Sequence, residues 1–266
     1  MNIECIHFDL DSVLYIPAAF LENTLNLTVR VMIENGLQAD FDEALAKLHE
    51  IRQENSNAGD HFDLLCKHFN GYLDPIIIAS GVEKYWDCKS GNMMAAPHAH
   101  YVLGRLSQKY PLSIISNGRP VKQAGKLVRL ELAHFFTRYD ADKGVYQRFF
   151  YATDDPAKAK PFPYLWQQSQ QDVSFAFENA VMVGDRYWAD MLGAKLLGMT
   201  TVKVNQGGHR LESIDQAYEE NAYKLKQIFG ESPAREKLMG LMQPDYEIDS
   251  LDDLFQVVKQ IESEAE

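Results

Sequence analysis

Short apolar segments that alternate with longer segments of helical periodicity dominate the hydrophobic pattern of this chain. Four apolar runs stand out, at 3–8, 112–116, 181–185 and 201–204, and three of them lie beside Asn, Asp or Gly. Short runs of this kind between helical patterns are typical of buried strands in a parallel sheet. The pattern therefore predicts an α/β fold, with a Rossmann-like parallel sheet sandwiched by helices.

The segment after the second apolar run has the periodicity of an amphipathic helix. Pro120 stands in its first turn, a position that proline favours. Apolar residues then recur at helical spacing, at Val121, Ala124, Leu127 and Val128. This spacing predicts a helix within 119–132 whose apolar side covers the sheet.

Two further segments extend this simple core. Residues 15–95 show helical spacing without a convincing strand and are too long for one crossover helix. We therefore expect an inserted helical cap at 15–95, with the core formed by 1–14 and 96–266. Within the core, the polar helical stretch 208–243 is interpreted as an amphipathic surface addition or an oligomer contact. It precedes a last strand and a terminal helix.

Charge and cysteine content narrow the class of protein. A formal net charge of -12 and the lack of a Lys/Arg-rich block argue against nucleic-acid or anionic-membrane binding. Cys5, Cys66 and Cys88 are an odd number without a C-x-x-C spacing, which favours a reducing compartment, and we expect a cytoplasmic protein. Glu4 and Asp9 interrupt the N-terminal apolar run, which argues against a signal peptide there. No apolar stretch reaches the roughly 18 residues of a spanning helix, so no membrane span is expected.

Carboxylates follow two of the predicted strands. Asp9 and Asp11 follow the first strand, and Asp185 and Asp190 follow the strand at 181–185. Because ligands of open parallel sheets bind at the carboxyl ends of the strands, these side chains are expected to converge. Four carboxylates repel one another unless a cation lies among them. Mg²⁺, which binds carboxylate and phosphate oxygens, satisfies this requirement.

The second predicted strand ends in Ser116-Asn117-Gly118. Asn-Gly is a favoured hairpin turn, but a hairpin needs a second strand at once, and a helical pattern follows here instead. These polar residues are therefore expected at the same edge of the sheet as the carboxylates.

Taken together, these residues match a known family. The chain resembles the haloacid dehalogenase superfamily, in the phosphatase-rich subgroup with a helical cap after the first motif (subfamily IA). The motifs occur in the family's order: Asp9-Leu10-Asp11-Ser12-Val13, Ser116, Lys160-Pro161-Phe162-Pro163, and Gly184-Asp185 with Asp190. The resemblance runs over nearly the whole chain and leaves out only 208–243.

The resemblance implies phosphoryl-transfer chemistry. Asp9 is expected to be the nucleophile that forms an aspartyl-phosphate, and Asp11 the general acid and base. Ser116, the backbone amide of Asn117 and Lys160 are expected to bind phosphate oxygens.

The resemblance also implies a set of Mg²⁺ ligands: Asp9, the backbone carbonyl of Asp11, and Asp185. Asp190 is either a further ligand or the partner that orients the lysine of the third motif. That lysine is either Lys160, which the Pro-x-Pro that follows favours, or Lys158.

The leading hypothesis is a Mg²⁺-dependent phosphatase for a small phosphorylated metabolite. A phosphomutase on sugar phosphates and a non-catalytic binding protein on the same fold are the alternatives. Specificity is expected to come from the cap, with 52–65 as its most polar segment. The sequence leaves the physiological substrate and the oligomeric state open.

Overall fold

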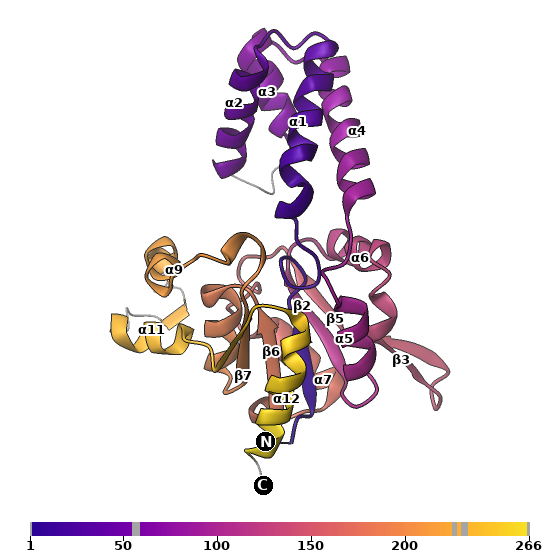
Figure 1. The fold of residues 1–266 in the computed structure, drawn as a ribbon, viewed down its shortest axis with the longest axis vertical. Helices are drawn as coiled ribbons and strands as arrows, with labels where there is room; N and C mark the ends of the chain where they lie inside the picture. Colours follow the sequence, from indigo (N-terminus) through magenta and orange to yellow (C-terminus); the bar gives the residue numbers. More distant parts are fainter. Residues whose placement is uncertain (1, 55–58, 225–227, 230–233, 265–266) are drawn as a thin grey trace. The chain divides into compact units, whose positions relative to one another are not determined.

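The chain folds into two compact units, which are described separately. The computed structural model describes residues 2–54, 59–224, 228–229 and 234–264. One unit comprises Met1–Pro17 and Met94–Glu266, and the other comprises Ala18–Met93 (Figure 1).

A six-stranded parallel sheet forms the centre of the first unit. Its strands, in spatial order, are β5 (Phe150–Thr153), β2 (Leu112–Asn117), β1 (Cys5–Phe8), β6 (Ala180–Gly184), β7 (Thr200–Val204) and β8 (Tyr246–Ile248). Every neighbouring pair in this sheet is parallel. All residues of β1 and β6 are buried, as expected for strands covered on both faces. The predicted α/β fold with a parallel sheet is confirmed.

The helices of this unit are α5 (Ala99–Leu106), α6 (Pro120–Arg129), α7 (Tyr164–Val173), α8 (Gly193–Leu196), α9 (Ile214–Asn221), α11 (Arg235–Met242) and α12 (Leu254–Ser263). Helix α7 contacts β2 and β5, and α8 contacts β7. The terminal strand β8 and helix α12 occur where the last predicted strand and helix were expected.

The contact between α7 and α8 depends on a glycine. A Cβ on Gly193 would lie 2.5 Å from the ring of Trp166 and 3.0 Å from the Cα of Pro161. Trp166 is fully buried, so its ring has no space into which it can move.

We expect Gly193→Ala to destabilise the protein by about 1–3 kcal/mol through overpacking, although alanine favours helix. Gly125→Ala is the matched control, because Gly125 lies within α6 and nothing is within 4 Å of its added Cβ. The control should stabilise the protein by about 0.5–1 kcal/mol. Urea unfolding of both variants measures the change in the free energy of unfolding. Changes of the same sign in the two variants would contradict the prediction.

The face that helix α6 buries agrees only in part with the predicted one. Val121 and Val128 are 76% and 69% exposed, whereas Gln123, Lys126 and Leu127 are buried. The prediction that these two valines cover the sheet is wrong. Because the buried side of α6 approaches the polar ends of the strands, its polar side chains find partners there.

The chain forms an antiparallel hairpin after β2 and before β5 in the sequence, and this hairpin was not predicted. It consists of β3 (Thr137–Asp140) and β4 (Val145–Arg148), paired with each other outside the main sheet. Strand β5 was also missed, because its short apolar run follows a polar, irregular segment.

The segment 208–243 packs on the core, although residues 225–227 and 230–233 lie outside the described residues. Helices α9 and α11 contact a π-helical turn, η3 (Tyr187–Leu192). The buried residues of this cluster are Tyr187, Trp188, Ala189, Met191, Leu192, Ala217, Leu238 and Met242. The interpretation of an amphipathic addition fits this packing, and its partner is the turn that follows β6.

The second unit is helical. It consists of α1 (Ala18–Glu34), α2 (Phe41–Glu54), α3 (His61–Asn70) and α4 (Pro75–Asn92). Leu25, Val29 and Met32 recur along one face of α1 and are buried in its core, as the periodicity predicts. Of the polar segment 52–65, residues 55–58 lie outside the described residues. That this unit is a cap for the core stays a prediction.

No helix within the described ranges combines the length and the apolar character that crossing a membrane requires.

Candidate active site

The candidate site is a pocket of about 130 Å³ at the carboxyl ends of the central strands. Because β2, β1 and β6 are neighbours in the sheet, the polar residues that follow them meet at one edge. The pocket is lined by Asp9, Asp11, Ser12, Ser116, Asn117, Lys160, Asp185, Arg186, Ala189 and His209. Six of the seven predicted site residues therefore line one pocket, and the seventh, Asp190, contacts the pocket residue Lys160.

A buried lysine joins two of the carboxylates. Lys160 Nζ donates to Asp9 Oδ1 at 2.7 Å and to Asp190 Oδ1 at 2.5 Å, and its side chain is 3% exposed. Burial lowers the pKa of Lys160, but the charges of Asp190 and Asp9 outweigh this, and the net pKa is raised. Lys160 is therefore a fixed cation at the base of the pocket.

Asn117 holds the backbone of Lys160 in place. The Asn117 side chain donates to the Lys160 carbonyl at 3.0 Å and accepts from the Lys160 N–H at 2.7 Å. This two-bond clamp ties the loop after β5 to the end of β2. The side chain of Asn117 thus has a structural contact in addition to the role expected for its backbone amide.

Lys158, the alternative third-motif lysine, points elsewhere. Its ammonium pairs with Asp155 at 3.2 Å, and its side chain is 49% exposed. Lys160, and not Lys158, contacts the carboxylates of the pocket.

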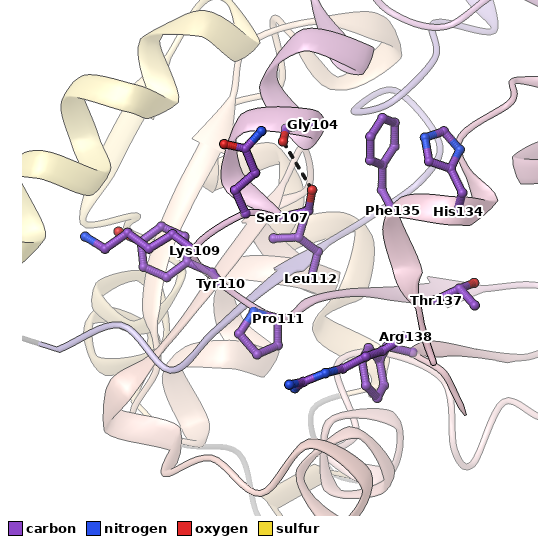
Figure 2. Close-up of a pocket in the computed structure, with 12 residues that line it drawn as sticks. Gly104, Ser107, Lys109, Tyr110, Pro111, Leu112, His134, Phe135, Thr137 and Arg138 are labelled. Carbon is purple, nitrogen blue, oxygen red and sulfur yellow. Dashed lines mark hydrogen bonds between the residues drawn. The ribbon is translucent and has the colours of Figure 1, made fainter. Parts of the chain in front are cut away.

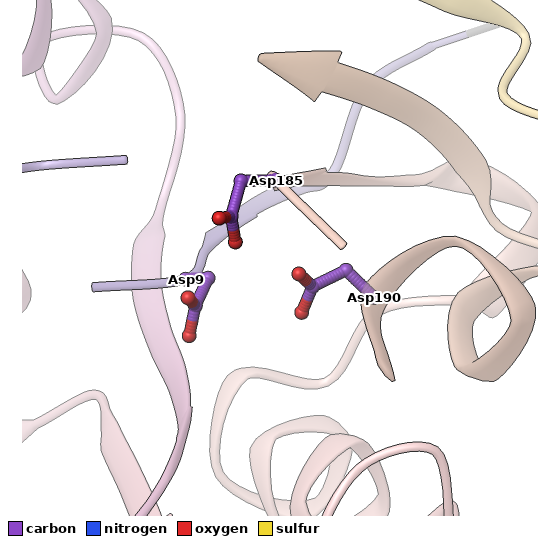
Figure 3. A group of neighbouring side chains, drawn as sticks. All are labelled: Asp9, Asp185 and Asp190. Carbon is purple, nitrogen blue, oxygen red and sulfur yellow. The ribbon is translucent and has the colours of Figure 1, made fainter. Parts of the chain in front are cut away.

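Three buried carboxylates, those of Asp9, Asp185 and Asp190, lie close to one another (Figure 3). Asp9, Asp185 and Asp190 each offer an oxygen within 4.8 Å of the others. Burial and the charges of Asp190 and Asp11 raise the pKa of Asp9 to about 6, against the opposing charge of Lys160. Burial, followed by the charges of Asp190 and Asp9, raises the pKa of Asp185 well above its ordinary value. Lys160 pairs with only two of these three carboxylates, Asp9 and Asp190, which leaves an excess of negative charge in the cluster.

The free oxygen of Asp185 marks the position where a cation fits. Asp185 Oδ2 is buried and has no hydrogen-bond partner. Such an atom is costly unless a ligand satisfies it, and carboxylate oxygens are the donors that Mg²⁺ prefers. The residues present therefore fit a hard divalent cation between Asp9 and Asp185.

Asp190 has both oxygens engaged within the protein. Oδ1 accepts from Lys160, and Oδ2 accepts from the backbone N–H of Arg186 at 3.1 Å. A Cβ on Gly184 would lie 2.4 Å from Asp190 Cβ, so glycine at this position makes room for Asp190. Of the two roles left open for Asp190, this geometry favours the one that orients Lys160.

Asp11 lines the same pocket but is not one of the three clustered carboxylates. Its carboxylate pairs with Lys126 at 2.6 Å and also accepts from Tyr15 and Gln123. Burial raises the pKa of Asp11, but the charge of Lys126 and these hydrogen bonds lower it by more, so the net pKa is lowered. That the Asp11 backbone carbonyl binds a metal stays a prediction.

Sequence reasoning missed Gln123, Lys126 and His209 as residues of this region. Gln123 and Lys126 are three residues apart on a helix and therefore share a face. This polar pair could have indicated that a polar face of the helix is buried at the site. The prediction used the apolar residues of the helix instead. His209 lies in the segment 208–243, which had been interpreted as surface.

A larger pocket, of about 560 Å³, lies away from these residues (Figure 2). It is formed where α5 leads into β2, and its lining includes Lys109, Tyr110, His134 and Arg138. Lys109 is neutralised by Glu262 at 2.7 Å. No predicted site residue lines this pocket, so the chemistry of the side chains, rather than volume, identifies the candidate site.

Comparison with known proteins places this geometry in context. Residues 158–228 match a family model described as HAD-hydrolase-like, a match that reaches into the segment 208–243. The expectation that all of 208–243 lies outside the family resemblance is therefore wrong for residues 208–228.

The curated relatives include two archaeal enzymes named glyceraldehyde 3-phosphate phosphatase. The protein from Pyrococcus furiosus is 33% identical over 83% of this chain and 88% of its own length. The protein from Methanocaldococcus jannaschii is 33% identical over 78% of this chain and 87% of its own length.

Two solved structures share the fold. A HAD phosphatase from Thermococcus onnurineus has a TM-score of 0.62 and 21% identity, covering 96% of this chain and 98% of that one. The HAD-hydrolase YfnB from Bacillus subtilis, described as bound to magnesium, has a TM-score of 0.61 and 18% identity, covering 97% and 100%.

Proposed function

The chain belongs to the haloacid dehalogenase superfamily, and from this premise we propose that it is a Mg²⁺-dependent phosphatase of a small phosphorylated metabolite. The observation that carries the proposal is the buried cluster of Asp9, Asp185 and Asp190, in which Lys160 pairs with Asp9 and Asp190, in a pocket that Asp11 also lines. A nucleophile, a proton-transfer group and donors for phosphate oxygens thus lie around one pocket. The names of the curated relatives support a phosphatase and make glyceraldehyde 3-phosphate the first substrate to test.

In the first step, an oxygen of Asp9 attacks phosphorus. The bond between phosphorus and the ester oxygen breaks, and the leaving oxygen takes a proton from Asp11. This produces an aspartyl-phosphate and a free alcohol. Lys160, Ser116 and the backbone amide of Asn117 bind the remaining phosphate oxygens as charge passes through the transition state.

In the second step, water attacks the phosphorus of the aspartyl-phosphate. Asp11, now a carboxylate, accepts a proton from this water, and Asp9 leaves as a carboxylate with release of phosphate. Both protonation states of Asp11 are therefore used in one cycle.

Asp9, the Asp11 carbonyl and Asp185 would hold Mg²⁺, with the free Asp185 oxygen as the best-defined donor. When bound, the ion would polarise the phosphoryl group and shield the charge of Asp9. Asp190 would keep Lys160 in place, as its two engaged oxygens indicate.

The core residues contact only the phosphate, the metal and the leaving oxygen in this scheme. We therefore place the choice of substrate in Ala18–Met93, acting as a cap. The three cysteines form no disulfide, which supports the proposed cytoplasmic location. No observation on the site favours the phosphomutase or the binding protein over the phosphatase.

The direct test is phosphate release from 4-nitrophenyl phosphate and from glyceraldehyde 3-phosphate, in Mg²⁺ and in EDTA. We expect release that requires Mg²⁺ and falls at least about 1,000-fold in Asp9→Asn, because the nucleophile is lost. Asp42→Asn is the control, since Asp42 belongs to another D-x-D pair and is exposed. Activity that persists in Asp9→Asn or in EDTA would contradict the proposal.

A further inference from the structure

Three side chains hold the carboxylate of Asp11. Lys126 Nζ lies 2.6 Å from Oδ1 and 2.8 Å from Oδ2. The Tyr15 hydroxyl donates a hydrogen bond to Oδ1, and Gln123 Nε2 donates one to Oδ2 at 3.1 Å. Both oxygens of Asp11 are thus fixed from two elements, α6 and the segment after β1.

Gln123 links this carboxylate to the end of β2. Its Nε2 lies 3.0 Å from Ser116 Oγ and 2.7 Å from the Asn117 carbonyl, in addition to Asp11 Oδ2. Gln123 is 3% exposed. The proton-transfer group and the predicted phosphate-binding serine therefore share one neighbouring donor group.

The buried amide of Gln123 costs the folded state free energy. Its Oε1 is buried without a hydrogen-bond partner, which costs about 1–3 kcal/mol. The opposite amide orientation would place this oxygen against the Asp11 carboxylate and the Asn117 carbonyl, which repel it. An apolar side chain would avoid the cost, so the N–H donors of Gln123 are what the site uses.

Gly118 provides the space for Gln123. A Cβ on Gly118 would lie 2.9 Å from Gln123 Nε2, and the backbone there has φ +131°, which favours glycine. The Ser116-Asn117-Gly118 strand end and the polar face of α6 are therefore fitted to each other.

Building on the proposed function, we propose that Tyr15, Gln123 and Lys126 form a holder that positions Asp11 for proton transfer. They are positioning residues, since in the proposed scheme they act through Asp11 and not on the substrate. The Asp11 side chain is 36% exposed and is free to rotate into solvent if the holder is lost. Proton transfer requires heavy atoms at about 2.6–3.2 Å, so a rotated Asp11 is inactive in both steps.

The two steps of the reaction allow a positioning role to be separated from general damage. Formation of the aspartyl-phosphate from 2,4-dinitrophenyl phosphate needs no proton, because dinitrophenolate leaves as a stable anion. Formation from an alkyl phosphate needs the proton of Asp11. Hydrolysis of the aspartyl-phosphate needs Asp11 as a base with either substrate.

The experiment compares Lys126→Met and Gln123→Met with the wild-type enzyme in Mg²⁺. With glyceraldehyde 3-phosphate, we expect kcat/KM to fall about 10–100-fold, a part of the 10²–10⁴-fold contribution of acid–base catalysis. With 2,4-dinitrophenyl phosphate, kcat should fall by a similar factor while kcat/KM stays within about 3-fold of wild type. A pre-steady-state burst of dinitrophenolate should accompany this, because the aspartyl-phosphate accumulates.

Two further variants keep the test decisive. Tyr15→Phe removes one hydrogen bond and no charge, so it remains usable if Lys126→Met impairs folding. It should show the same kinetic pattern with smaller fold-changes. Val128→Ala, on the exposed face of α6, should behave as wild type.

Equal losses of kcat/KM on both substrates would show a structural role and overturn the holder. Unchanged kinetics on both substrates would overturn it as well. If the wild-type enzyme itself releases no phosphate, or does so without Asp9, the proposed phosphatase fails first and the holder fails with it.

Discussion

Lys160→Ala should lower phosphatase activity by at least about 100-fold, the effect of removing one fixed donor to a transition-state oxygen. Lys160 also neutralises Asp9 and Asp190 in a buried site, where its ammonium lies 2.7 and 2.5 Å from their oxygens. Removal of one partner from a buried ion pair costs about 3–5 kcal/mol, so the variant should also be less stable. Because a bound divalent cation replaces part of the missing charge, Mg²⁺ should recover some of this stability.

Lys158→Ala is the matched control. Lys158 is two residues away, and its half-exposed side chain contacts Asp155 outside the pocket. Its removal should leave activity within about 2-fold of wild type and stability within about 0.5 kcal/mol. Steady-state kinetics in saturating Mg²⁺ and urea unfolding measure the two effects. Equal losses of activity in both variants would refute the assignment of Lys160 as the third-motif lysine.

Asp185→Asn should reverse the order of stability with and without Mg²⁺. In EDTA, the variant should be at least as stable as wild type, because Asp185 is a buried carboxylate beside Asp9 and Asp190 and its Oδ2 has no partner. At a Mg²⁺ concentration 100 times its dissociation constant, the free energy of unfolding of the wild-type protein should rise by about 2.7 kcal/mol. The variant should gain little, because its best-defined metal donor is replaced by a neutral amide.

Thermal unfolding in EDTA and across a Mg²⁺ titration measures this crossover without any assay of activity. Asp154→Asn is the control, since Asp154 is exposed and outside the cluster. It should keep the full stabilisation by Mg²⁺. A variant that is stabilised by Mg²⁺ as strongly as wild type would exclude Asp185 as a ligand.

The sequence by itself determined the strands that carry the site, their polar ends and the family. The runs around Cys5–Phe8, Leu112–Asn117 and Ala180–Gly184 are short and apolar, and each is followed by polar residues. Because parallel strands share a direction, this local order was enough to predict that the polar ends meet. It was also enough to predict the helical segment between the first two strands, since periodicity is a local property.

The tertiary structure decided which side chains touch. Which of Lys158 and Lys160 contacts the carboxylates depends on how the loop after β5 is clamped by Asn117, a contact over 43 positions along the chain. The position of Asp190 next to Lys160 likewise depends on the turn that follows β6. Such contacts are set by packing between distant segments and leave no periodic signal.

Helix α6 shows why the remaining part of the site was hidden. Two of the four apolar residues that predicted its buried face, Val121 and Val128, lie in solvent, because hydrophobic periodicity assumes an apolar partner for the buried face. The buried face of α6 instead meets the carboxylate of Asp11, where Gln123 donates a hydrogen bond and Lys126 forms an ion pair, contacts that valine cannot make. The sequence determined that α6 is a helix, and only the three-dimensional arrangement of charges determined which side of it faces the site.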